Sequence, residues 1–287
     1  KIMSYFIENS LFDKLTKQIF EKKSFLCVGL DPDPSKMPES LVREEDFLFK
    51  FNKAIVDATA QYAVAFKPNL AFYECHGVSG WQALQETIAY IKANYPEIIV
   101  IADAKRGDIG NTSKMYARAM FDKLGADIVT VAPYMGSDSI KPFLEYDGKA
   151  IALLALTSNA GANDFQLLET MESDHLFIDV LNTSVTWGTP NNMMFVVGAT
   201  QKISYLERVR EIVPNNFLLI PGVGAQGGSL EEVARKCMNK ACGILVNSSR
   251  GIIHADNSEN FAAAAAEKAA QMQSEMEALL VGYGLID

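Results

Sequence analysis

Charged side chains follow three apolar runs of the sequence, at the points where these runs end. Asp31 follows the first run, Lys67 the second, and the segment Asp103-Ala104-Lys105-Arg106-Gly107-Asp108 the third. Side chains two positions apart on a strand share a face, so Asp103 and Lys105 are predicted to point together. Acids and bases arranged in this way can stabilise a charge that develops during a reaction or hold a proton for transfer. The alternative is a structural ion pair that only fills one end of the fold. Burying each of its charges costs desolvation free energy.

Two later segments have the composition of an anion site. The first is glycine-rich and runs from 221 to 228, and the second, 247–251, contains Arg250. Glycine lets main-chain N–H groups approach an anion closely, and an arginine adds a two-pronged donor. The pair of segments therefore predicts a phosphate site.

A divalent cation bound by Asp31, Asp103 and Asp108 is a further possibility for the charged group. Lys67 and Lys105 already place positive charge among these carboxylates, so we expect no metal. The three histidines have no partner at ligand spacing and are predicted to be surface or loop residues: His76, His175 and His254.

The element pattern predicts an α/β fold in which these residues share one face. Eight short runs are apolar at consecutive positions, as in parallel strands covered on both sides, and they lie at 25–31, 63–69, 98–105, 127–133, 150–157, 194–200, 217–224 and 243–250. Each gap between them has room for a helix. Eight β/α units make a (β/α)8 barrel, whose working face is at the carboxyl ends of the strands.

Helical patterns occupy the gaps, and the whole chain, 1–287, is predicted to be one barrel domain. Three- and four-residue apolar spacings predict helices over 80–94, 112–124, 201–213 and 229–238, with Ser79 and Ser229 as caps. An additional helix is expected at about 4–20, in preference to a signal peptide. The widest gap, about 158–193, predicts an enlarged loop and helix that serves as a lid or a variable decoration.

The composition of the chain argues against two classes of protein, nucleic-acid binders and membrane-spanning proteins. The chain has 26 Lys and Arg against 35 Asp and Glu, a net charge of −9, which argues against a nucleic-acid binder that relies on overall charge. No apolar run approaches the roughly 18 residues of a membrane span. The four cysteines are irregularly spaced, without CxxC, and are predicted to be reduced thiols of a cytoplasmic protein.

Five motifs in this order resemble the orotidine 5′-monophosphate decarboxylases over nearly the whole chain. They are Gly29-Leu30-Asp31, Phe66-Lys67-Pro68-Asn69, Asp103-x-Lys105-x-x-Asp108 followed by Gly110-Asn111-Thr112, Thr157-Ser158-Asn159, and 221–228. The long gap at 158–193 and Ser249, where many relatives have glycine, place the resemblance with a longer, bacterial-type subgroup.

The resemblance implies a reaction and a set of roles. The expected reaction is decarboxylation of orotidine 5′-monophosphate to uridine 5′-monophosphate, without a cofactor, in de novo pyrimidine biosynthesis. Lys67, Asp103, Lys105 and Asp108 would form the catalytic array, with Lys105 as the proton donor to C6. The remaining implied roles are ribose contacts for Asp31 and Lys67, a pyrimidine contact for Ser158, and phosphate contacts for Gln226 and Arg250. A homodimer is also implied, in which Asp108 and Thr112 serve the neighbouring subunit's site.

Two other functions fit parts of the pattern. A magnesium-dependent sugar-phosphate decarboxylase or a related aldolase would share the barrel and the Asp-x-Lys signature, but Thr157-Ser158-Asn159 and the two lysines favour the nucleotide reaction. A catalytically silent nucleotide-binding protein is the alternative outside enzymes, because a fold does not guarantee an activity.

Overall fold

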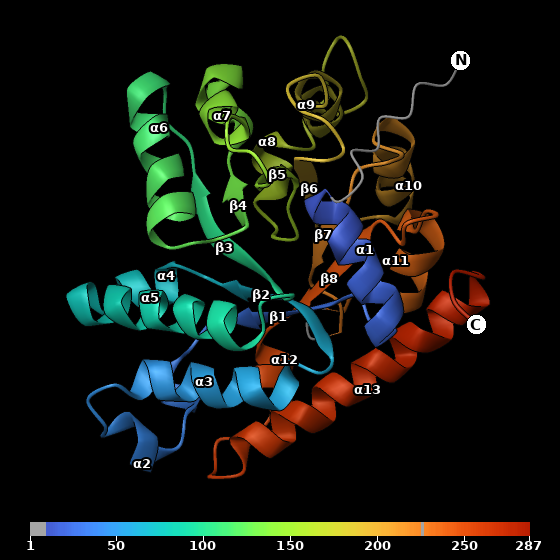
Figure 1. The fold of residues 1–287 in the computed structure, drawn as a ribbon. Helices are drawn as coiled ribbons and strands as arrows, with labels where there is room; N and C mark the ends of the chain where they lie inside the picture. Colours follow the sequence, from blue (N-terminus) through green and yellow to red (C-terminus); the bar gives the residue numbers. More distant parts are fainter. Residues whose placement is uncertain (1–9, 225–226) are drawn as a thin grey trace.

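The computed structural model describes residues 10–224 and 227–287, and its centre is a closed barrel of parallel strands (Figure 1). The strands pair in chain order, and β1 closes the barrel against β8. Their bounds are β1 Leu26–Leu30, β2 Ala63–Pro68, β3 Ile99–Arg106, β4 Ile128–Val131, β5 Ala150–Leu156, β6 Met193–Val197, β7 Leu218–Pro221 and β8 Ile244–Ser248. The predicted (β/α)8 barrel is confirmed.

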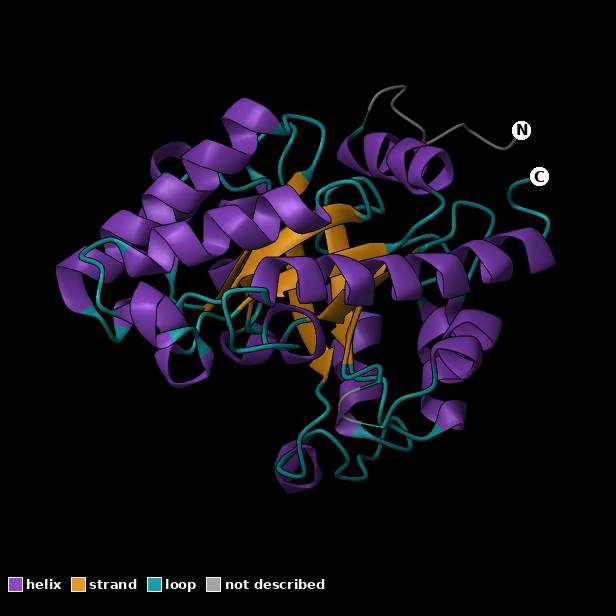
Figure 2. Ribbon diagram, turned by 90° about the horizontal axis from the view of Figure 1, so that it is seen from below, coloured by secondary structure: helices purple, strands orange, loops and turns teal. Residues whose placement is uncertain are grey.

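Helices surround the strands on the outside of the barrel (Figure 2). The α-helices are α1 Leu11–Lys22, α2 Glu39–Val42, α3 Phe47–Thr59, α4 Ala71–Glu74, α5 Gly77–Asn94, α6 Gly110–Arg118, α7 Ser137–Leu144, α8 Ala162–Phe165, α9 Leu176–Ser184, α10 Ile203–Ile212, α11 Leu230–Cys237, α12 Arg250–Ile253 and α13 Phe261–Gly282. Three other helical segments are η1 Pro34–Lys36, η2 Ala119–Lys123 and η3 Pro133–Met135.

Burial explains why consecutive apolar residues mark the strands. Every residue of β1, β2, β6 and β8 is buried, because one face of each strand packs inside the barrel and the other packs against the helices. Buried polar residues lie near the carboxyl ends of several strands: Lys67 in β2, Asp103 in β3, Thr130 in β4, and Asn247 and Ser248 in β8. The fold therefore brings these polar strand ends to one rim.

Three helix boundaries differ from the predictions. The helix expected at about 4–20 begins at Leu11, because the Ser10 side chain caps it; residues 4–9 of that range are outside the described part. Ser79 is not a cap, since α5 begins at Gly77 and the Ser79 hydroxyl donates to the carbonyl of His76. The helix expected over 112–124 begins at Gly110 and becomes a π-helix from Ala119 to Lys123.

The segment between β5 and β6 contains α8 and α9. The Gln166 side chain accepts from the Thr157 main chain at 2.7 Å, and Leu176 N donates to Leu168 O at 2.8 Å. The first bond ties the segment to the carboxyl end of β5, and the second closes the loop between α8 and α9 on itself. Across the described residues, no helix is long and apolar enough to cross a membrane.

Candidate active site

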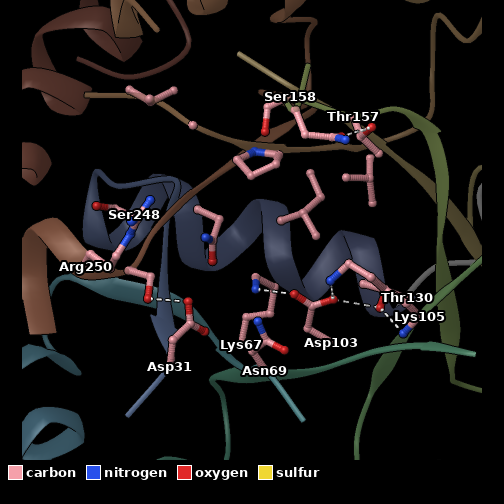
Figure 3. A pocket seen from close by; sticks show the side chains of 18 of the residues that line it. Asp31, Lys67, Asn69, Asp103, Lys105, Thr130, Thr157, Ser158, Ser248 and Arg250 are labelled. Carbon is pink, nitrogen blue, oxygen red and sulfur yellow. Dashed lines mark hydrogen bonds and ion pairs between the residues drawn. The ribbon is translucent and has the colours of Figure 1, made fainter. Parts of the chain in front are cut away.

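A cavity of about 530 Å³ opens at the carboxyl ends of the strands, and all eight strands or the loops that follow them contribute to its walls. This is the working face of a β/α barrel. Of the predicted site residues, the cavity brings together Asp31, Lys67, Asp103, Lys105, Ser158 and Arg250. Figure 3 shows these side chains around the same space.

The Asp103 carboxylate is bound by two lysines and a threonine (Figure 3). Lys67 Nζ lies 2.7 Å from Asp103 Oδ2, and Lys105 Nζ lies 2.6 Å from Oδ1. The Thr130 hydroxyl donates to Oδ1 at 2.9 Å and accepts from the Lys105 main-chain N–H at 2.9 Å. One hydroxyl therefore fixes both the Asp103 carboxylate and the backbone of Lys105.

Burial and neighbouring charges have opposite effects on the pKa values of Asp103 and Lys67. Burial raises the pKa of Asp103, but the charges of Lys67 and Lys105 outweigh it and hold that pKa well below its usual range. Burial likewise lowers the pKa of Lys67, and the carboxylates of Asp103 and Asp31 more than offset this and raise it. Asp103 is thus ionised and Lys67 protonated at neutral pH.

Lys105 reaches Asp103 because strand β3 is irregular at this point. The pairing of β3 with β4 shifts register between Ala102 and Arg106, and Lys105 has φ +46°, in the left-handed region. The two side chains do point together, as predicted, but a regular strand is not the reason. Backbone in this region costs roughly 1–3 kcal/mol for a residue other than glycine, and such strain concentrates at functional sites.

The strand residues that line the cavity form its floor, and this floor has a polar, charged part and an apolar part. Lys67, Asp103 and Thr130 come from β2, β3 and β4, whereas Leu154, Val196 and Leu219 come from β5, β6 and β7. A planar ligand on this floor meets fixed charges on one side and an apolar surface on the other.

Arg250 lies at the start of α12 and lines the cavity, together with Gly222, Val223 and Ser248 from the two predicted phosphate segments. Gln226, the other predicted phosphate residue, lies outside the described residues. Part of each segment thus borders the cavity.

Asp108 and Thr112 do not line the cavity of their own chain. Thr112 is exposed on α6, and Asp108 Oδ1 accepts from the Ile109 N–H at 2.7 Å. Apolar side chains beside them face solvent, since Ile109 is 52% exposed and Met115 is 49% exposed. The two residues therefore lie on the outside of their own chain, away from its cavity.

The structure adds residues to which the sequence analysis gave no role in the site. Asn69, Thr130, Asn247 and Lys36 line the cavity, and the Ser249 hydroxyl donates to Asp31 Oδ2 at 2.7 Å. Position directly after a strand was the available signal for Asn69 and Ser249. Threonine within an apolar strand carried no such signal.

The three histidines lie in turns or bends, as predicted, and are half-buried against aromatic rings. His76 lies edge-on to Phe47, His175 contacts Phe177 and Tyr205, and His254 stacks on Phe51. Burial lowers the pKa of His254. As for metals, both oxygens of Asp103 bind lysines, and nowhere in 10–224 or 227–287 do three His, Cys, Asp or Glu groups gather as a metal site.

Fold and site together define a (β/α)8-barrel protein with a preorganised charged site at the strand ends and a cationic side chain at one end of the cavity. Residues 24–266 match the family described as orotidine 5′-phosphate decarboxylase / HUMPS. The chain belongs to this family.

Similar proteins match this chain in sequence along nearly their full lengths. Orotidine 5′-phosphate decarboxylase from Phocaeicola vulgatus is 60% identical, covering 93% of this chain and 98% of that protein, and the Bacteroides fragilis protein is 59% identical, covering 94% and 96%. The structure of Leishmania donovani OMP decarboxylase is 37% identical with a TM-score of 0.77, covering 93% of this chain and all of that one.

Proposed function

We propose that this protein decarboxylates orotidine 5′-monophosphate to uridine 5′-monophosphate and CO2, a step of de novo pyrimidine biosynthesis. The observation that carries the proposal is the Lys67–Asp103–Lys105 group on the cavity floor. The bond between C6 and the carboxylate breaks, and its electron pair remains on C6. The Lys105 ammonium then donates a proton to C6, and the neutral amine regains a proton from solvent.

Electrostatics explains why such a group suits the reaction. The electron pair left on C6 lies in the plane of the ring, where the π system cannot delocalise it. Fixed charges can stabilise it without reorganising during the reaction. Hydrogen bonds and ion pairs hold Asp103 and both lysines before any substrate arrives, which supports this role.

The remaining cavity residues suggest how the substrate lies. Asp31 and Lys67 would contact the ribose, Ser158 the pyrimidine edge, and Arg250 with Gln226 the 5′-phosphate. The position of Arg250 near the strand-eight end supports this direction. Phosphate binding away from C6 would contribute binding energy that is used at the reacting carbon.

One assay separates this function from its alternatives. Protein treated with EDTA should consume orotidine 5′-monophosphate, followed as the loss of orotidylate absorbance, and form uridine 5′-monophosphate. Activity that appears only after Mg²⁺ is restored, on a sugar phosphate instead, would point to the metal-dependent reaction. Binding of the nucleotide without turnover would identify a silent relative.

Replacing Arg250 by alanine should lower kcat/KM by roughly 100-fold, about 3 kcal/mol, because charge-assisted bonds to the phosphate are lost. Steady-state kinetics measures this, and Arg208→Ala, which removes an exposed arginine paired with Glu211, is the matched control. Added phosphite should stimulate turnover of the nucleoside lacking phosphate in the wild type and not in Arg250→Ala. Equal kcat/KM in the wild type and Arg250→Ala would contradict the phosphate role.

We further propose a homodimer with shared sites, located in the cytoplasm, where free thiols persist. Asp108 and Thr112 lie beside exposed apolar residues and away from their own cavity, which supports their service to a partner. Lys105→Ala and Asp108→Ala dimers should each be nearly inactive. Unfolded together in equal amounts and refolded, they should recover about a quarter of wild-type sites, because half of the dimers are mixed and each mixed dimer has one intact site.

One outcome of the mixing experiment would contradict the shared site. If Asp108 serves its own subunit, every site in the mixture keeps one lesion. Verified mixed dimers without recovered activity would therefore exclude the shared site, and each variant refolded alone is the control. The reaction assignment would stand in that case.

A further inference from the structure

The two residues that flank α12 both contact Asp31. Before the helix, the Ser249 hydroxyl donates to Asp31 Oδ2 at 2.7 Å, a bond marked at Asp31 in Figure 3. After it, His254 Nε2 lies 3.2 Å from the Asp31 carbonyl oxygen and 3.4 Å from the Asp33 amide nitrogen. Either tautomer of the imidazole is therefore bonded to the main chain of this loop. Arg250 is the first residue of the same helix.

Packing makes α12 and its flanking residues one unit. Ile252 and Ile253 are buried, and the His254 ring stacks on Phe51 with a centroid distance of 5.5 Å. Strand β1 makes room for Ser249 at Gly29, where a Cβ would lie 2.7 Å from the Ser249 Cβ. Ser249 and His254 thus join α12 to both the side chain and the main chain of Asp31.

We propose that Ser249 and His254 are positioning residues that couple phosphate binding at Arg250 to the orientation of Asp31 toward the ribose. The inference deepens the proposed function and rests on it. An anion bound by Arg250 fixes α12, and α12 holds Asp31 ready for the sugar hydroxyls. Because coupling between sites is reciprocal, a ribose bound by Asp31 strengthens phosphate binding by the same factor.

Four ligands measure this coupling: uridine 5′-monophosphate, uridine, and the 2′,3′-dideoxy form of each. The measured quantity is the factor by which the dissociation constant rises when the hydroxyls are removed. In the wild type we expect this factor to be at least about fivefold larger for the nucleotides than for the nucleosides, the lower end of typical coupling. In Ser249→Ala and in His254→Phe, the two factors should agree within about twofold.

The variants are chosen to separate positioning from folding. His254→Phe retains an aromatic ring for the stack on Phe51 and removes both ring nitrogens, with a somewhat larger ring, and Ser249→Ala removes one hydroxyl. Ser35→Ala is the matched control, because the Ser35 hydroxyl bonds to Asp33 on the same loop at 2.7 Å without contacting Asp31. Thermal unfolding establishes that each variant is folded, and the two variants test the inference independently.

Each result is decisive. Wild-type coupling retained in either variant, or hydroxyl factors that fall equally for nucleotides and nucleosides, would overturn the inference while decarboxylation remained intact. A wild type that neither binds uridine 5′-monophosphate nor turns over the substrate would instead overturn the proposed function. Loss of coupling in both variants, with Ser35→Ala like the wild type, supports the positioning role.

Discussion

Lys105→Ala should lower kcat by about 10⁴-fold or more while the dissociation constant for uridine 5′-monophosphate changes less than tenfold. Lys105 is expected to act after the carboxylate begins to leave, as a charge beside C6 and then as the acid, and each contribution alone accounts for about 10²-fold or more. Asp103 retains its 2.7 Å bond to Lys67, so the cavity floor keeps most of its structure. The absorbance assay gives kcat, and calorimetry gives the dissociation constant.

Two further variants sharpen this test. Lys105→Arg keeps a positive charge but holds its proton too firmly to act as the acid, so it should also be nearly inactive. Lys17→Ala removes an exposed lysine paired with Glu21 and should match the wild type. A kcat near normal in Lys105→Ala would refute the mechanism.

Arg210→Met should destabilise the fold by about 3–5 kcal/mol and lower the melting temperature by on the order of 10 °C. The Arg210 guanidinium donates to main-chain carbonyls near the amino ends of β7 and β8, namely those of Cys237, Val213, Asn216 and Gly243, at 2.7–2.8 Å. Burial lowers its pKa to about 10, so it stays charged at neutral pH. Removing it takes a donor away from each of these carbonyls, of which that of Gly243 also accepts a main-chain bond, from the Leu218 N–H.

Thermal unfolding followed by circular dichroism measures the effect, and Arg208→Met is the control two residues away on the same helix. Arg210 lies at the opposite end of β7 and β8 from the cavity, so kcat of folded Arg210→Met should equal that of the wild type. A melting temperature within about 2 °C of the wild type would show that water satisfies these carbonyls equally well.

The strands were predictable because their signal is local. The run predicted at 150–157 is β5, Ala150–Leu156, since consecutive burial needs consecutive apolar residues. Helix ends were less predictable: a three- and four-residue spacing does not reveal the change to π-helix at Ala119, and a serine such as Ser79 can bond backward inside a helix instead of capping it. Tertiary context decides both.

The residues of the site likewise include some that the sequence predicted and some that it did not. Asp103 and Lys105 could be found because charged residues at the end of a buried strand are conspicuous. The partners of Asp31 could not, because Ser249 and His254 are more than 200 residues away in the chain and reach it only when β8 closes the barrel against β1. Thr130 was not identified because its hydroxyl acquires its role only in the folded barrel, through the Asp103 carboxylate and the Lys105 N–H at the register shift of β3.

The divided floor of the cavity has a consequence for how such a barrel can diversify. The charges stand on β2 and β3, whereas the apolar residues Leu154, Val196 and Leu219 stand on three other strands, with separate backbones. Leu154 pairs in register with Val196, and Val196 pairs with Leu219, so substitutions within the apolar half are coupled to one another. The bonds of the Asp103 carboxylate go to Lys67, Lys105 and Thr130, so the apolar half can change as one unit while the reactive half is inherited unchanged.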